Sequence, residues 1–102
     1  MAGIKCSNKI ADKLKAKHNV DVAEVQQCFR NRDPGRKFLT DTREEHKTDP
    51  ATHWFLAETN TGRILKVCFV PPHEGNGHSI EIKTAFEPND DEVRIYEKYS
   101  TK

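Results

Sequence analysis

Histidines and carboxylates, the residue types that bind metals and transfer protons, are concentrated in LTDTREEHKTDPATHWFLAET, residues 39–59. His46 and His53 lie seven residues apart in this segment. Asp41 and Asp49 lie nearby, so on ligand type alone the set could hold a metal ion. The spacing matches no compact metal motif. We therefore predict that this segment, as far as residue 52, is a polar connection, and that the chain needs no metal or other cofactor.

A second pair of histidines flanks two glycines in HEGNGH, residues 73–78. His73, Glu74 and His78 form H-E-x-x-x-H, which is one residue longer than the zinc-protease motif H-E-x-x-H. That motif works because histidines four residues apart point from one face of a helix, and the glycines argue against a helix here. We predict a hairpin loop. The sequence also lacks a Gly-Lys-Ser/Thr phosphate loop and the G-x-S-x-G signature of a nucleophilic serine.

Lysines recur at four-residue spacing in NKIADKLKAKHNV, at Lys9, Lys13 and Lys17. On a helix this spacing places them in one stripe. The stripe could contact RNA phosphates or an acidic partner helix, and it could equally be a solvated helix face. His18, at the end of this helix, could supply a functional imidazole, although capping the last carbonyl groups is the favoured interpretation.

Three further cations fall on a predicted hairpin and its sheet. Arg63 follows the turn, and the side chains of Lys66 and Lys83 are expected to project from an uncovered outer face of the sheet. Such a face could position RNA, and it could also be exposed sheet kept soluble by its charges. Tyr96 is expected to pack rather than to react.

The composition is typical of one small domain over residues 1–102. Residues 1–50 contain eleven Lys and Arg against eight Asp and Glu, and the remaining residues contain six against eight, which together give the net charge of +1. A total so near zero argues against tight sequence-independent binding of nucleic acid. The three cysteines do not suggest a disulfide framework, and no segment has the pattern of a membrane span or a secretion signal. We expect a cytoplasmic protein.

The apolar pattern predicts an α+β fold. Helical periodicity is followed by a period of two and then by helical periodicity again. Asp21 with Glu24, and Asn89 with Glu92, have the spacing of helix capping boxes. The prediction is two N-terminal helices and one C-terminal helix around a three- to four-stranded antiparallel sheet, with the helices on one face.

Three segments carry a resemblance to a known family: LKAKHNVDVAEV, WFLAETNTGRILKV and IKTAFEPNDDEVRIYEK. Together they resemble the BrnT-type toxins, small proteins with a RelE-like α+β fold that cleave RNA and are silenced by a DNA-binding antitoxin. The resemblance runs from about residue 10 to 98. The matched motifs are K-H-x-V at Lys17, His18 and Val20, G-R at Gly62 and Arg63, and Y-E at Tyr96 and Glu97.

The chain departs from this family where cations are expected. Trp54 stands where the family pattern has an arginine, and Phe86 and Glu87 stand where it has an Arg-Lys pair. Cleavage of RNA by its 2′-hydroxyl group needs cations or acids beside the phosphate. The resemblance therefore implies the family fold with part of the catalytic charge missing.

The resemblance implies specific roles and partners. His18 and Arg63 would serve phosphate binding or proton transfer with Tyr96 near the site, and the lysines would bind RNA. The implied partners are RNA and an acidic antitoxin segment, with no membrane, and a homodimer is left open. A non-catalytic immunity or antitoxin-like domain on the same scaffold is the alternative. Similar sequences are often labelled ADP-ribosyl-(dinitrogen reductase) hydrolase, which we rank last because that activity resembles much longer, all-helical di-metal proteins.

Overall fold

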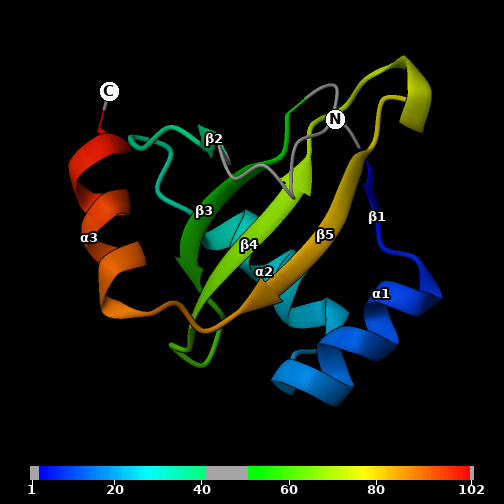
Figure 1. The fold of residues 1–102 in the computed structure, drawn as a ribbon, viewed down its shortest axis with the longest axis horizontal. Helices are drawn as coiled ribbons and strands as arrows, with labels where there is room; N and C mark the ends of the chain where they lie inside the picture. Colours follow the sequence, from blue (N-terminus) through cyan, green and yellow to red (C-terminus); the bar gives the residue numbers. More distant parts are fainter. Residues whose placement is uncertain (1–2, 41–50, 102) are drawn as a thin grey trace.

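The computed structural model describes residues 3–40 and 51–101. The α+β class predicted from the sequence is confirmed (Figure 1). The helical elements are α1 (Asn8–Lys13), the π-helical turn η1 (Leu14–His18), α2 (Val22–Asn31), the 3₁₀ turn η3 (Glu74–Asn76) and α3 (Asp90–Tyr99). The strands are β1 (Ile4–Lys5), β2 (Leu39–Thr40), β3 (His53–Glu58), β4 (Ile64–Val70) and β5 (Ile80–Phe86).

The sheet is five-stranded and mixed, in the order β1-β5-β4-β3-β2. Strands β2 to β5 pair antiparallel, as predicted. β1 adds a parallel edge, with Ile4 opposite Ile80 and Lys5 opposite Glu81. The predicted three to four antiparallel strands therefore missed β1, because two residues are too short to show a period of two.

The helix ends follow the local capping signals. Ser7 Oγ accepts a hydrogen bond from the amide of Ile10 at the start of α1. The Asn89 side chain accepts from the Glu92 amide at 2.8 Å, and Glu92 accepts in return from the Asn89 amide at 3.0 Å, which confirms the predicted capping box of α3. The first helical run ends where Asn19 adopts a left-handed conformation with φ of 52°.

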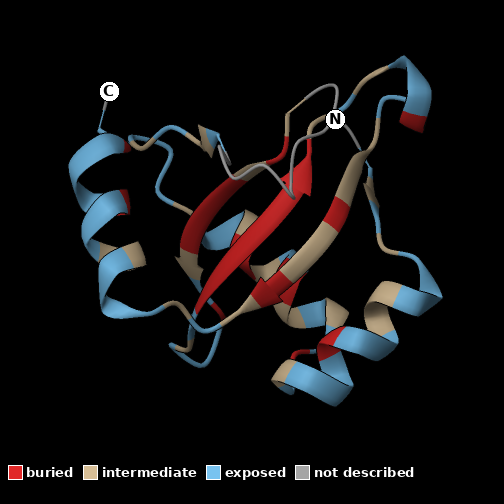
Figure 2. Ribbon diagram, viewed as in Figure 1, coloured by how far each residue is buried: buried red, intermediate tan, exposed pale blue. Residues whose placement is uncertain are grey.

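Helices cover both faces of the sheet, so the prediction that they share one face is wrong. Phe29 of α2 packs edge-on against Phe55 and Phe69, which fixes α2 on one face. The neighbouring positions of these strands point the other way, and there Trp54 contacts Tyr96 of α3. Figure 2 shows that buried residues run along the centre of the sheet, whereas the outer surfaces of the helices are exposed.

The HEGNGH segment is a compact turn, as predicted, with η3 at its centre. Asn76 Oδ1 accepts hydrogen bonds from the amides of His73 and Ser79, and His73 Nδ1 accepts one from Gly75. Gly77 takes a φ of 67°, a conformation that favours glycine. The His73 ring therefore stabilises the turn. Within residues 3–40 and 51–101, no helix has the length and apolar character needed to span a bilayer.

Candidate RNA-contact site

Arg63 is the centre of a charged cluster at the end of the β3–β4 hairpin. The turn positions it, since the Arg63 carbonyl accepts from the Thr59 amide at 2.8 Å and Gly62 supplies a φ of 86°. The Arg63 guanidinium donates to the backbone carbonyl of Asn19 at 2.8 Å and to that of His18 at 3.0 Å. Arg63 therefore caps the C-terminal end of η1, where the helix dipole favours a cation.

Two carboxylates neutralise this guanidinium. Glu24 of α2 lies 3.3 Å from Nη1 of Arg63, and Glu87 lies 3.5 Å from its Nε. The Arg63 side chain keeps 23% of its surface exposed, and that of Glu87 keeps 66%. We call Arg63, His18, Glu24, Phe86 and Glu87 the hairpin-end cluster. With one guanidinium and two carboxylates, it presents no excess positive charge to a phosphate.

The His18 imidazole lies beside Arg63 but does not cap the helix. Its ring rests against Phe86, with ring centroids 5.4 Å apart and a tilt of 37°. No hydrogen bond joins the ring to any of the described residues, and the capping role predicted for His18 belongs to Arg63 instead. Toward the described residues, both nitrogen atoms of this half-buried ring are free of hydrogen bonds, as proton transfer requires.

The lysine stripe follows the first helical run to the hairpin-end cluster. Lys9, Lys13 and Lys17 are exposed, and within the described part of the chain no carboxylate pairs with them. The ion pair of this run uses Lys15 instead, whose ammonium lies 3.1 Å from Asp21. The stripe ends at Lys17, one residue before His18 in the sequence.

Lys66 does not project from an open face, which corrects the expectation drawn from the sequence. Its side chain is buried, with 5% relative exposure, and its ammonium pairs with Glu92 of α3. The same ammonium lies 4.6 Å from the centre of the Trp54 ring and 5.5 Å from that of Phe86. α3 closes this part of the sheet, so Lys66 must leave its carboxylate before it could reach RNA.

Lys83 and Tyr96 lie apart from the hairpin-end cluster. Lys83 is 40% exposed and pairs with Glu81 of the same strand at 3.3 Å. Tyr96 packs on Trp54 and below the guanidinium of Arg36, whose central carbon lies 5.6 Å from the centre of the Tyr96 ring. Burial raises the pKa of the Tyr96 hydroxyl, and the nearby charges of Arg32 and Arg36 oppose that increase. The structure thus joins His18 and Arg63 but separates both from Tyr96.

The described residues contain no group of three or more His, Cys, Asp or Glu side chains that could hold a metal ion. His46, Asp41 and Asp49, in the segment predicted to be a polar connection, lie outside the described residues. His53 lies on β3 with its ring packed edge-on against Phe69.

No family model matches this chain, and a search of the curated proteins finds no significant match.

The residues that sequence reasoning missed are the carboxylates and the backbone groups of the cluster. The sequence identifies Glu24 only as a helix-capping residue, and Glu87 only as a carboxylate where the family pattern has a cation. That substitution was the available signal for a neutralised arginine. The contacts with Asn19 had no signal, because 44 residues separate it from Arg63 and the bonds use backbone carbonyls.

Proposed function

We propose that this chain is a small toxin-type protein of the BrnT and RelE-like kind that acts on RNA as a metal-independent endoribonuclease. The observation that supports this proposal is the lysine stripe, which is exposed and lacks carboxylate partners among the described residues. It ends one residue before His18, whose imidazole makes no hydrogen bond to a described residue. An RNA strand lying along the stripe would bring its backbone to an acid–base group.

The proposed chemistry assigns one task to each group. Lys9, Lys13 and Lys17 would neutralise phosphates and hold the strand. His18 would transfer a proton to or from the 2′-hydroxyl group or the leaving oxygen. Arg63 would meet the scissile phosphate by exchanging Glu87 for a phosphate oxygen, because an exposed ion pair of this kind is weak.

A second candidate is a non-catalytic binding domain on the same scaffold, of the immunity or antitoxin-like type. The ion pairs of Arg63 with Glu24 and Glu87, and of Lys66 with Glu92, favour it because they use the cations that cleavage would need. In either case the lysine stripe would also receive an acidic segment of an antitoxin or other partner. ADP-ribosyl-(dinitrogen reductase) hydrolysis stays the lowest-ranked candidate.

Binding to RNA is tested by fluorescence anisotropy with a labelled single-stranded RNA over a range of salt concentrations. Replacing Lys9, Lys13 and Lys17 by glutamate should weaken binding and should lower the slope of log affinity against log salt by about 0.7 for each lysine that contacts a phosphate. Lys37 and Lys98, exposed at the other side of the molecule, provide the control, since the variant Lys37→Glu/Lys98→Glu should retain the slope. Equal losses in both variants would contradict a defined RNA surface.

Cleavage is tested separately, by growth arrest on induction and by incubation of RNA with the purified protein. His18→Ala should abolish both activities while the protein binds RNA as before. Intact RNA and harmless expression of the natural chain, together with stripe-dependent RNA binding or capture of an acidic partner peptide, would favour the non-catalytic candidate. A chelator should leave RNA cleavage unchanged. If the chain is instead an ADP-ribosyl hydrolase of the di-metal type, a chelator should remove that activity.

A further inference from the structure

The outer edge of β3 is only partly covered by strand pairing. β2 pairs with His53 and Trp54 at the beginning of β3. The chain preceding β2 diverges from β3 and pairs with the C-terminal end instead, since the Lys37 amide donates to the Ser100 carbonyl at 2.7 Å. Among the described residues, no strand therefore lies on the outer side of residues 55–58 (Figure 1).

The backbone groups of Leu56 face this uncovered edge. Asn31, at the end of α2, donates to the Glu58 carbonyl at 3.0 Å, so this carbonyl points to the outer side. Backbone groups in an antiparallel strand alternate in direction, and Leu56, two residues earlier, therefore points the same way. Among the described residues no strand bonds to this amide and carbonyl, and an edge residue of this kind can receive a further extended chain.

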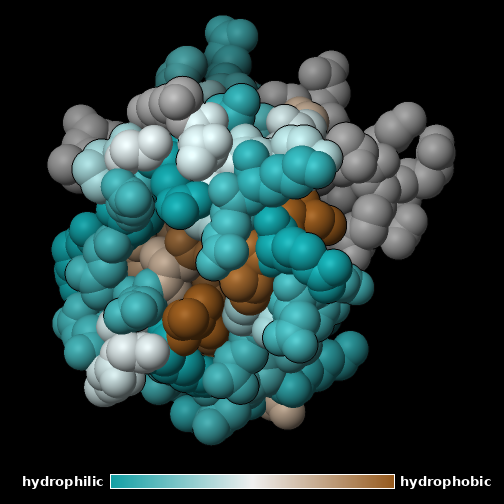
Figure 3. Space-filling model, turned by 90° about the vertical axis from the view of Figure 1, so that its left-hand side faces the viewer, coloured by the Kyte–Doolittle hydropathy of each residue, from teal (hydrophilic) through white to brown (hydrophobic). Residues whose placement is uncertain are grey.

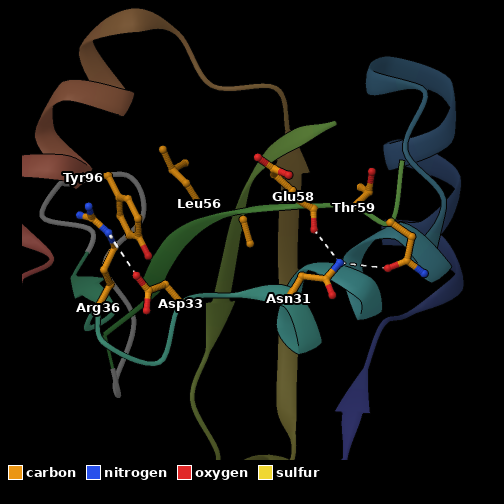
Figure 4. A pocket seen from close by; sticks show the side chains of 9 residues that line it. Asn31, Asp33, Arg36, Leu56, Glu58, Thr59 and Tyr96 are labelled. Carbon is orange, nitrogen blue, oxygen red and sulfur yellow. Dashed lines mark hydrogen bonds and ion pairs between the residues drawn. The ribbon is translucent and has the colours of Figure 1, made fainter. Parts of the chain in front are cut away.

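Two hollows adjoin this edge and share Leu56, Ala57, Glu58, Arg36 and Tyr96. A pocket of about 510 Å³ lies between β3 and the connection from α2 to β2 (Figure 4). A smaller one of about 210 Å³ lies between β3 and α3. Figure 3 shows hydrophobic side chains reaching the surface in a hollow on this side of the molecule. We call the two hollows together the β3 edge groove.

Tyr96 supplies an unused polar group to the groove. Only 5% of the residue is exposed, and its hydroxyl makes no hydrogen bond within the described structure. Figure 4 shows the hydroxyl pointing into the pocket from α3, toward Asp33 and β3. The amide of Leu56 lies close enough to lower the pKa of the hydroxyl, without meeting hydrogen-bond geometry. A buried hydroxyl without a partner is costly, and a ligand could satisfy it.

The charge of the groove favours a basic occupant. Asp33 pairs with Arg36 at 3.8 Å. Glu58 and Glu97 also line the groove, and the ion pairs of the described residues leave both without a cation. Ile64, which is 45% exposed, adds an apolar side chain at the rim. Within the described part of the chain, the groove thus combines two carboxylates outside any ion pair, an apolar rim and a strand edge that no other strand covers.

We propose that the β3 edge groove binds an extended, basic segment of a partner protein, which adds to the sheet beside Leu56. Backbone pairing at a sheet edge provides the affinity in this mode, and side chains in alternate pockets provide the specificity. A second copy fits less well, because antiparallel pairing of two β3 strands would bring Glu58 opposite Trp54, whose edge β2 already occupies. The groove uses none of the lysine stripe, so the proposal does not depend on activity toward RNA.

The test uses the full chain and synthetic heptapeptides with blocked ends. TKVKVKT is the basic probe, and TEVEVET has the opposite charge. Two further versions of the basic probe carry N-methyl groups on alternate amides, one in each register. NMR follows the ¹⁵N–¹H signals and the hydrogen exchange of the Leu56 and Glu58 amides, and sedimentation measures the oligomeric state.

The basic probe should shift both amide signals and slow exchange at Leu56, whereas TEVEVET should not. One methylated register should bind like the parent and the other should lose binding, because only alternate amides face the sheet. The variant Glu58→Lys/Glu97→Lys should weaken binding by about fivefold for each charge pair lost, and Glu74→Lys, on the distant turn, should not. Tyr96→Phe should weaken binding by about threefold and leave the fold intact.

Three outcomes would overturn the proposal. The first is no shift at Leu56 with the basic probe up to about 2 mM, a concentration that detects even weak binding. The second is equal binding of both methylated registers, which would show contact by charge alone. The third is a dimer of the free chain in which the Leu56 amide is already protected, since a second copy would then occupy the groove.

Discussion

At the scale of single residues, Arg63 shows how a cation in a recognisable motif can serve the fold before it serves chemistry. It binds two backbone carbonyls at the end of η1 and two carboxylates from α2 and the end of β5. These contacts join three segments that are far apart in the sequence. Any functional test on Arg63 must therefore separate its effect on stability from its effect on activity.

Arg63→Ala should lower the free energy of unfolding by about 2 kcal/mol, because the helix end loses charged hydrogen bonds in a partly exposed site. Arg63→Lys should restore only part of this, since an ammonium lacks the planar fork that reaches both carbonyls. Urea unfolding followed by far-UV circular dichroism measures both. Arg30→Ala, on an exposed position of α2, is the control and should change little. Loss of growth arrest at unchanged stability would show that Arg63 acts on the substrate instead.

Lys66 and Lys83 offer a matched pair for the effect of burial on an ion pair. Lys66→Met should cost about 3 kcal/mol, since it removes the ammonium that pairs with the largely buried Glu92 carboxylate. Lys83→Met removes an exposed pair with Glu81 and should cost no more than about 0.5 kcal/mol. Urea unfolding of both variants gives the comparison. Equal stability of the two variants would contradict a structural role for the Lys66–Glu92 pair.

At the scale of elements, α3 is the helix that closes the second face of the sheet. Its capping box fixes where it begins, Glu92 reaches Lys66, and Tyr96 packs on Trp54. Glu92 takes part in both the cap and the ion pair, so the start of the helix and its attachment to the sheet depend on the same side chain.

Asn89→Ala should destabilise the protein by about 1 kcal/mol, because the first turn of α3 loses the side chain that accepts from the Glu92 amide. Asn89→Asp should retain stability, since aspartate caps equally well and its charge suits the helix dipole. Amide exchange in α3 and urea unfolding measure the effect. Asn8→Ala, at the first position of α1, is the control, and an equal loss there would contradict the capping argument.

At the scale of the whole molecule, three surfaces can be distinguished: the lysine stripe, the hairpin-end cluster and the β3 edge groove. The lysine stripe and hairpin-end cluster lie on the side of α1 and η1, whereas the β3 edge groove lies on the side of α3. The principal extents of 31, 29 and 27 Å are nearly equal, so these surfaces belong to one compact body. The stability of this body at high pH depends on two buried ionisable groups, the Cys28 thiol and the Tyr96 hydroxyl.

Stability should decrease above about pH 9. Burial raises the pKa of the Cys28 thiol from 9.0 to about 12, with Glu24 adding to the increase and Arg63 opposing it, and burial also raises the pKa of Tyr96. The folded chain therefore keeps these protons to higher pH than the unfolded chain. The contribution of Cys28 is fully present below pH 9 and is lost as the pH rises toward 12.

This pH dependence is measured by urea unfolding between about pH 8 and 11, followed by circular dichroism. The double variant Cys28→Ala/Tyr96→Phe should show a shallower decrease over this range than the natural chain, whatever its stability at neutral pH. Tyr99→Phe is the matched control, since Tyr99 is 54% exposed. A decrease of the same steepness in all three proteins would show that other groups control the alkaline limit.

The local elements were determined by the sequence itself. Periodicity placed three helical regions and the antiparallel strands, and the Asn89–Glu92 spacing gave the start of α3, because caps and turns depend on residues within four positions of one another. The sequence also identifies His18 and Arg63 as candidate site residues. Their proximity arises only in the tertiary structure, although the segments that resemble the BrnT-type toxins contain both residues.

Only the tertiary structure decided which faces and charges are available. Cys68 and Val70 on the second face of β4 indicate burial on both sides, and Lys66 on the same face obscures that signal. An alternating pattern shows which residues share a face but not what covers it, because the covering helix lies elsewhere in the chain. For the same reason the sequence could not show that Arg63 meets two carboxylates, that Lys66 meets Glu92, or that Tyr96 lies apart from His18.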